Sequence, residues 1–289
     1  MSICIISLGV KILVIVDAAM DIKSFSFWVN RFCCNIQINI CAESVECDYT
    51  LYIQKAEKQM YLTETTSTMF GLENISDKDY PWIAKYVSQI FEYFFEHNNM
   101  CQIHSVSIGD DNGKAIMLIG DYWQGKTSSA LMATKKHPNL KILSDYYTVY
   151  SNGKLTGYNE MIQLNNSNRH IKCSNEIVKM FDERTYYKDD GNNKTERELV
   201  GIVVPHIRAN DKLFRKIPAN EAYWFLYEKI SILISGVAIL FQGKVPSISF
   251  DNINLKNNRL RIASDLTKVP MYYISSDIES ISDEIKNLF

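Results

Sequence analysis

Eight consecutive residues, Gly120-Asp121-Tyr122-Trp123-Gln124-Gly125-Lys126-Thr127, match the phosphate-loop pattern GxxxxGK[ST]. Glycines in such a loop let backbone N–H groups wrap around a phosphate with no Cβ in the way. The Lys126 ammonium would reach the β- and γ-phosphates of ATP, and the Thr127 hydroxyl would ligate Mg²⁺. The pattern therefore predicts a nucleotide site for ATP and Mg²⁺, formed by the residues from Gly120 to Ser128.

The segments on either side of this loop fit its expected surroundings. Residues 115–119 are an apolar run typical of a buried strand, and residues 126–136 have the pattern of a helix. The positive end of that helix would favour a bound phosphate. Tyr122 and Trp123 are bulky where such loops usually carry small residues. We therefore expect these two side chains to point outward or to stack on another group.

Two further residues could take part in chemistry at this loop. Asp145 ends a strand-like run, Lys141-Ile142-Leu143-Ser144, which follows the helix after the loop. An acidic residue in that place suits a Mg²⁺ ligand, or a base that accepts the proton of an attacking hydroxyl. His104 begins a strand before the loop, and by itself such a histidine is more typical of a packed residue than of a catalytic one.

Two Asn-Gly pairs predict antiparallel hairpins around the loop. Asn112-Gly113 lies between strand-like residues 103–108 and 114–119, and Asn152-Gly153 lies between 148–150 and 154–156. Because hairpins pair strands antiparallel, the sheet that carries the loop should be mixed rather than purely parallel.

These residues together resemble the catalytic core of HPr kinase/phosphorylase, and of the wider group of HPr-kinase-like proteins that share a fold with phosphoenolpyruvate carboxykinase. The resemblance runs from His104 through the hairpin, the phosphate loop and Asp145 to Gly157, and weakly includes residues 269–288. It implies that His104 matches the family's active-site histidine. It also implies that Asp145 matches the first acid of an Asp–Asp pair, and that Gly120, Gly125, Lys126 and Thr127 match the phosphate and Mg²⁺ binders.

The sequence departs from this family in three places. Tyr146 stands where the second acid of the pair is expected, and no glycine-bounded acidic signature follows residue 160. The first hundred residues are more similar to the small β-rich leader of stand-alone HPr-kinase-like proteins, some of which phosphorylate peptides. HPr itself is therefore not expected as the substrate.

These observations predict an α/β protein with two domains. Residues 1–99 would form a β-rich domain that ends in an amphipathic helix. Residues 100–289 would form a mixed-sheet nucleotide-binding domain, of the HPr kinase/phosphoenolpyruvate carboxykinase type by the resemblance. The leading functional hypothesis is an ATP-dependent kinase (a phosphotransferase) that phosphorylates a hydroxyl on a peptide, a protein or a small molecule. Asp145, His104 and Lys126 would be its catalytic residues, and Thr127 and Asp145 its Mg²⁺ ligands.

Two alternatives remain open. The chain could be a catalytically impaired nucleotide-binding regulatory or scaffold protein, which Tyr146 and the bulky loop residues motivate. A carboxykinase-like enzyme acting on a small acid ranks last, because no motif places Arg169, Arg184, Arg208 or Arg215 around a carboxylate. The sequence leaves the oligomeric state open, a homo-oligomer included.

Composition excludes several other classes of protein. The 289 residues carry a net charge of −2, so no basic surplus predicts binding to nucleic acid or to an anionic membrane. The seven cysteines include no CxxC pair and are expected as reduced, mostly buried thiols of a cytoplasmic protein. The apolar start, residues 3–16, lacks a basic leader and is predicted as a buried strand rather than a secretion signal. The second apolar stretch, residues 230–241, is too short to cross a membrane.

Elsewhere, hydrophobic periodicity predicts individual elements. Residues 25–63 are expected to be β-rich, and residues 80–97 to form a helix whose stripe of Trp82, Tyr86, Ile90 and Phe94 belongs to the core. Residues 182–198 are charged and predict a solvated loop or a substrate-contacting lid. Strands are expected at 199–204 and 271–274, and helices at 221–233 and 277–288, the last with a capping box of Ser276 and Glu279.

Overall fold

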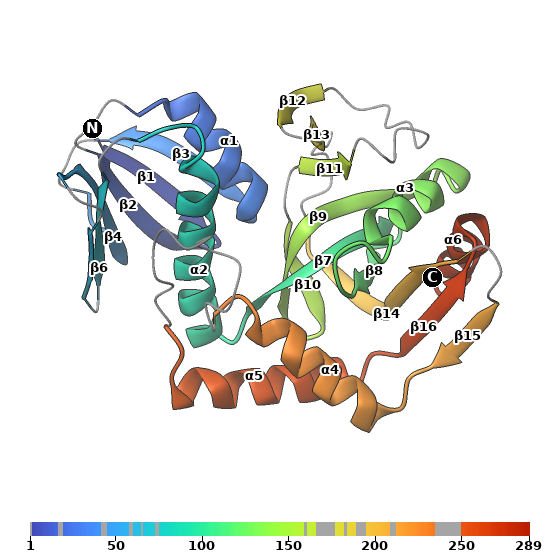
Figure 1. The fold of residues 1–289 in the computed structure, drawn as a ribbon. Helices are drawn as coiled ribbons and strands as arrows, with labels where there is room; N and C mark the ends of the chain where they lie inside the picture. The colour runs from blue at the N-terminus through green and yellow to red at the C-terminus, as the bar shows by residue number, and fades with distance from the viewer. Residues whose placement is uncertain are drawn as a thin grey trace. The chain divides into compact units, whose positions relative to one another are not determined.

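The computed structural model describes residues 2–16, 20–41, 45–57, 60–64, 66–72, 75–158, 161–165, 177–181, 184–188, 195–208, 212–234 and 250–289. The chain divides into two compact units, and each unit is made of two segments. The first unit comprises Met1–Asn98 and Ile232–Leu255, and the second comprises Asn99–Ser231 and Lys256–Phe289. Both units combine helices with a mixed sheet, so the protein is of the α/β class (Figure 1).

The first unit has a six-stranded sheet in the order β3-β1-β2-β4-β6-β5 and two helices. The strands are β1 (Ser2–Ser7), β2 (Val10–Val16), β3 (Ile36–Cys41), β4 (Tyr49–Lys55), β5 (Met60–Thr63) and β6 (Ser67–Leu72). The helices are α1 (Ile22–Phe32) and α2 (Tyr80–His97).

The amino-terminal segment differs from the sequence-based expectation in two ways. Residues 3–16 form a hairpin of two strands instead of one, because Leu8 and Gly9 turn the chain with positive φ angles of 46° and 89°. Residues 25–32, expected to be β-rich, belong to α1. Its aromatic residues favour strands, but Asp21 caps the helix by accepting from the backbone N–H groups of Lys23 and Ser24.

Helix α2 confirms the predicted helix and its contribution to the core. Tyr86 and Ile90 are fully buried, while Trp82 and Phe94 are half-buried. The Tyr86 hydroxyl lies 2.7 Å from that of Thr68 on β6, which lies 2.8 Å from the hydroxyl of Tyr49 on β4. This chain of buried hydroxyls joins the helix to the sheet.

The second unit has a seven-stranded sheet in the order β10-β9-β7-β8-β14-β16-β15. The strands are β7 (Cys101–Asp110), β8 (Lys114–Ile119), β9 (Leu140–Ser151), β10 (Lys154–Tyr158), β14 (Arg197–Ile207), β15 (Leu213–Lys216) and β16 (Met271–Ser276). A three-stranded sheet consists of β11 (Met161–Asn165), β13 (Arg184–Lys188) and β12 (Ile177–Phe181). The helices are α3 (Lys126–Lys136), α4 (Ala219–Ser231), α5 (Ile253–Leu266) and α6 (Ile278–Asn287).

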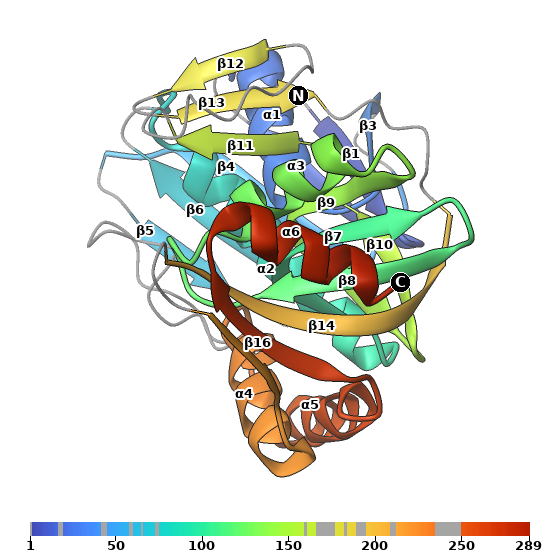
Figure 2. The ribbon, with the colours of Figure 1, turned by 90° about the vertical axis from the view of Figure 1, so that its right-hand side faces the viewer.

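Strand β8, which leads into the phosphate loop, is buried on both faces. Ala115, Met117 and Ile119 join one hydrophobic cluster with residues of α4 and α5. Ile116 and Leu118 join a second cluster with residues of α3 and α6. In Figure 2, α6 lies against β14 and β16, and α4 and α5 lie next to each other below β16. Helices therefore cover both faces of the sheet around β8, which holds the loop in place.

Both predicted hairpins are confirmed, and both turns meet the start of β14. Gly113 and Gly153 have φ angles of 83° and 81°, which glycine adopts without strain. The backbone N–H of Glu198 donates to Gly113 O at 2.9 Å, and that of Leu199 donates to Gly153 O at 3.0 Å. Strand β10 also pairs with β14, so β10, β9, β7, β8 and β14 form a closed circuit of strand pairings.

Other expectations are corrected or fall outside the described residues. Of residues 182–198, expected as a loop, Arg184–Lys188 form β13 because β11 and β12 pair with that segment on both sides. The last helix is capped by Asp277 instead of Ser276, since its carboxylate accepts from the Ser280 N–H at 2.8 Å. Strand β15 and helix α5 were not expected.

The apolar stretch at 230–241 is described only to residue 234, and α4 ends at Ser231. No helix within the described ranges is long and apolar enough to cross a membrane. Cys173 lies outside the described residues. Each of the six described cysteines is a free thiol, and four of them are buried.

Candidate functional site

The phosphate loop connects the end of β8 to the first residue of α3, as predicted. Gly120 and Gly125 have φ angles of 147° and 92°, in the range that side chains disfavour. A Cβ at Gly125 would overlap the Ile207 side chain at the end of β14, and one at Gly120 would overlap the Gln124 amide. The backbone conformation at both positions therefore favours glycine, and at Gly125 the branched Ile207 side chain also leaves no room for a Cβ.

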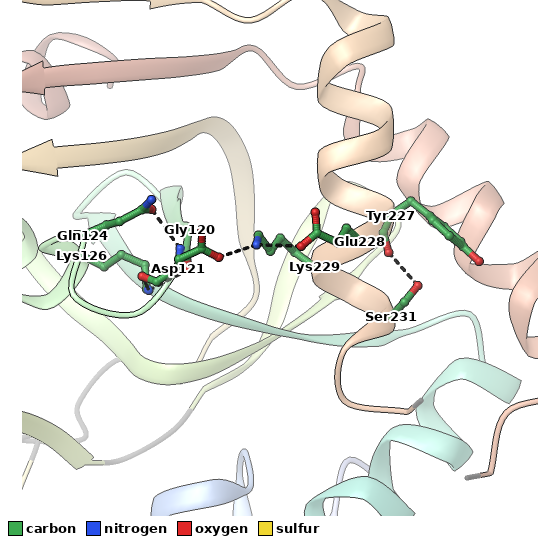
Figure 3. Close-up of polar contacts among 8 residues, drawn as sticks. All are labelled: Gly120, Asp121, Gln124, Lys126, Tyr227, Glu228, Lys229 and Ser231. Atoms are coloured by element: carbon green, nitrogen blue, oxygen red, sulfur yellow. Dashed lines mark hydrogen bonds and ion pairs between the residues drawn. The ribbon is translucent and has the colours of Figure 1, made fainter. Parts of the chain in front are cut away.

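Lys126 folds back over the loop that precedes it. Its side chain is buried, and its ammonium donates to Gly120 O at 2.9 Å and to Asp121 O at 2.8 Å (Figure 3). The Gln124 side-chain oxygen accepts from the Asp121 N–H at 2.9 Å and closes the loop further. Burial lowers the pKa of Lys126 to about 8; the carboxylates of Asp145 and Asp121 oppose this shift, and the Lys229 ammonium adds to it.

Thr127 and Asp145 are brought together directly. The Thr127 hydroxyl donates to Asp145 Oδ1 at 2.7 Å, although the two residues belong to α3 and β9. Asp145 is buried, and its Oδ2 accepts from the Gln163 N–H on β11 at 2.6 Å. The pair places a hydroxyl and a carboxylate, both oxygen donors of the kind that Mg²⁺ prefers, at the N-terminus of the loop helix.

Asp145 was expected at the end of a strand but lies inside β9, which is distorted at the next residue. Tyr146 has a φ of 125°, outside the usual range for a residue with a side chain, and it is buried. The Ser144 hydroxyl forms a short hydrogen bond to Tyr147 O across this point. Backbone conformations of this kind cost free energy and cluster at functional sites. The distortion thus lies beside the carboxylate that the sequence singles out.

His104 lies in a group of aromatic rings at the side of the loop. Its ring centroid is 4.9 Å from that of Tyr122, 5.0 Å from that of Tyr146 and 5.9 Å from that of Tyr147. The Tyr122 ring is tilted by 40° to the His104 ring, and its side chain is 55% exposed. The Trp123 side chain is 79% exposed, and the residue has a φ of 70°. Ser128 is buried in the first turn of α3.

Sequence reasoning missed two residues of this site. The backbone of Gln163 holds Asp145, and Lys229 on α4 forms an ion pair with Asp121 at 2.6 Å (Figure 3). Lys229 is 108 positions from Asp121, and no motif marks Gln163 or Lys229. The sequence offered only a charged pair, Glu228 and Lys229, in the second half of a predicted helix, and such pairs are common on helix surfaces.

Among the described residues, no group of three or more His, Cys, Asp or Glu side chains is arranged to hold a metal ion. A Mg²⁺ ion at Thr127 and Asp145 would need water and phosphate oxygens to complete its shell, as is usual for this ion. No protein-family model matches the sequence, and a search of curated proteins finds no match.

Proposed function

We propose that this protein is an ATP-dependent kinase that transfers the γ-phosphate to a hydroxyl on a peptide, a protein or a small molecule. The observation that carries the proposal is the 2.7 Å contact between Thr127 and Asp145 at the helix that Lys126 opens. A phosphate loop that only binds anions needs no buried acid beside its hydroxyl. A loop that binds MgATP for phosphate transfer does need an acidic side chain that ligates the metal ion.

The proposed roles follow from the positions of the side chains. Backbone N–H groups of the loop and the N-terminus of α3 would bind the β-phosphate. The Lys126 ammonium would leave the loop carbonyls for the β- and γ-phosphates. The oxygens of Thr127 and Asp145 fit Mg²⁺, which would neutralise charge on the phosphates when bound.

In the proposed transfer the acceptor hydroxyl oxygen forms a bond to the γ-phosphorus, and the bond from that phosphorus to the bridging oxygen of ADP breaks. The hydroxyl proton passes to the Asp145 carboxylate, to which the Gln163 N–H donates, so that the carboxylate is held in one orientation. His104 contacts Tyr122 of the loop and would line the acceptor side of the site.

The fold supports a finer proposal, a core of the HPr kinase type. The hairpin of β7 and β8 leads into the loop, α3 follows, and β9 returns next to β7 with Asp145 paired to Val106. This order of elements is the one that the resemblance implies for residues 100–158.

One observation favours a second candidate, a nucleotide-binding regulator that transfers no phosphate. Tyr146 occupies the place of the expected second acid, and its ring packs on those of His104 and Tyr147 instead of offering a carboxylate. A single acid would then have to hold the metal and accept the proton. Phosphate transfer, and not nucleotide binding, separates the two candidates.

The test is calorimetric titration of the protein with ATP and ADP, with and without Mg²⁺, beside Lys126→Ala and the surface control Lys268→Ala. We expect Mg²⁺-dependent binding that Lys126→Ala weakens at least a hundredfold and Lys268→Ala leaves unchanged, because Lys268 is 76% exposed. Transfer of labelled γ-phosphate to peptides, or its release as phosphate, then decides for the kinase. A folded protein that binds neither nucleotide would refute both candidates.

A further inference from the structure

Lys229, near the C-terminal end of α4, is an unusually placed lysine. Its side chain is 8% exposed, and its ammonium lies 2.6 Å from Asp121 Oδ1 and 3.1 Å from Glu228 Oε1 (Figure 3). The lysines in four other ion pairs are 37% to 76% exposed, namely Lys136, Lys141, Lys154 and Lys268. Burying an ammonium costs free energy unless anionic groups compensate it. The position of Lys229 therefore calls for an explanation.

The two buried lysines of the site meet at one loop residue. Lys126 donates to the backbone oxygen of Asp121, while Lys229 donates to its side-chain carboxylate. The Lys229 charge lowers the pKa of Lys126, so the two ammonium groups are close enough to repel each other. These two cations are balanced by the carboxylates of Asp121, Glu228 and Asp145, so a phosphate that enters the site would compete with a carboxylate for one of them.

The hydrogen-bond partners of Lys229 show which carboxylate a phosphate can replace. The pKa of Lys229 is raised: burial lowers it, but the hydrogen bonds to Asp121 and Glu228 outweigh burial, so the ammonium stays charged. The Asp121 side chain is 68% exposed and can turn to solvent, while Glu228 still pairs with the Lys229 ammonium until a phosphate replaces Asp121. The Lys229 ammonium also lies 5.1 Å from the centre of the Phe225 ring, which supports it from within α4.

We propose that Lys229 is a second phosphate-binding cation, which exchanges the Asp121 carboxylate for the terminal phosphate of a bound nucleoside triphosphate. The inference rests on the proposed function, because it assigns a further ligand to the same nucleotide site. The loop N–H groups serve phosphates that a diphosphate and a triphosphate share, while Lys126 reaches from the β- to the γ-phosphate. Lys229 would serve the one that only the triphosphate has, and so selects ATP over ADP.

A purely mechanical role predicts something different. If the ion pair only braces the loop against α4, loss of either partner loosens the loop, and ATP and ADP affinity fall together. If Asp121 competes with phosphate for Lys229, loss of the two partners has opposite effects. Lys229→Met then weakens ATP binding, while Asp121→Asn strengthens it.

The experiment measures MgATP and MgADP affinity by calorimetry for the full chain and for Lys229→Met, Asp121→Asn, the double variant and the surface control Lys268→Met. We expect Lys229→Met to lower ATP affinity by about tenfold or more and ADP affinity by less than about threefold. Asp121→Asn should raise ATP affinity severalfold, and this gain should disappear in the double variant, since Lys229 is then absent. Lys268→Met should match the unchanged protein.

Each outcome of these affinity measurements supports or overturns the proposed role of Lys229. Equal losses for ATP and ADP in Lys229→Met, or weaker ATP binding in Asp121→Asn, would overturn the proposal while leaving the kinase intact. If Lys229→Met unfolds, Lys229→Arg keeps the charge and should keep the preference for ATP, and loss of that preference with intact thermal stability would count against a phosphate contact. Absence of MgATP binding by the unchanged protein would refute the proposed function and this inference with it.

Discussion

The two ends of the seven-stranded sheet use glycine for different reasons. Where β14 begins, Gly113 and Gly153 have positive φ angles, and a Cβ at either would meet no atom within 4 Å. Where β8 and β14 finish, Gly120 and Gly125 also have positive φ angles, but a Cβ at either would overlap a neighbouring side chain. A turn needs only the conformation, whereas the loop needs the conformation and the space.

Two buried aspartates show the same contrast between the turn end and the loop end of the sheet. Asp110 at the turn end is buried, and its carboxylate accepts from the N–H groups of Asn112 and Lys114, which are its own neighbours in sequence. Asp145 at the loop end is equally buried but accepts from Thr127 and Gln163, each 18 positions away. One carboxylate completes a local turn, while the other joins three separate segments at a site.

The strongest test of this contrast compares Asp145→Asn with Asp110→Asn. An amide in place of the Asp145 carboxylate could not accept the proton of the attacking hydroxyl, so we expect phosphate transfer to fall about a hundredfold or more, with nucleotide affinity within about tenfold. Asp110→Asn should instead lower the free energy of unfolding by about 1–2 kcal/mol and leave transfer intact. Transfer assays and denaturant titrations measure both effects, and full turnover by Asp145→Asn would show that its assigned role is wrong.

A second test compares Gly125→Ala with Gly153→Ala. Both changes strain a residue at positive φ and should each lower the free energy of unfolding by about 1 kcal/mol or somewhat more. Only Gly125→Ala also displaces Ile207 and the loop, so we expect it to weaken nucleotide binding by about tenfold or more. Calorimetry on both variants is the measurement. Equal nucleotide affinity in the two variants would mean that the close approach at Gly125 has no part in binding.

The smallest effect concerns pH and Lys126, whose pKa in the free protein is about 8. A bound phosphate raises the pKa of a neighbouring ammonium, so binding takes up a proton when the free lysine is neutral. Nucleotide affinity should therefore be constant below about pH 8 and fall by up to about tenfold per pH unit above it. Titration with ATP at saturating Mg²⁺ from about pH 7 to about pH 9.5 tests this, and a flat profile contradicts it.

The same pH profile of nucleotide affinity also tests the interaction between Lys126 and Lys229. Asp145 and Asp121 raise the pKa of Lys126, and Lys229 lowers it. In Lys229→Met the break in the profile should move to higher pH, because the repelling charge is gone. A break that stays in place would mean that the two ammonium groups do not interact in solution.

Local sequence patterns by themselves determined much of the architecture around the loop. The glycine pattern located the strand, loop and helix between Ile119 and Lys136, and the Asn-Gly pairs located both hairpins. The apolar stripe after Pro81 located α2. Each of these features depends on the backbone preferences of residues close together in the chain, which the sequence states directly.

Tertiary structure alone decided which distant groups meet. The aromatic run in α1 is compatible with a strand or a helix, and the Asp21 cap and the packing of one face selected the helix. The contacts of Asp145 with Gln163 and of Asp121 with Lys229 depend on how β11 and α4 dock on the sheet. Docking of these elements is driven by the burial of apolar surface. This driving force is not directional, so it does not mark in the sequence which distant residues will meet. The sequence could therefore locate the glycine loop between β8 and α3, but only the folded chain brought a second buried lysine to it.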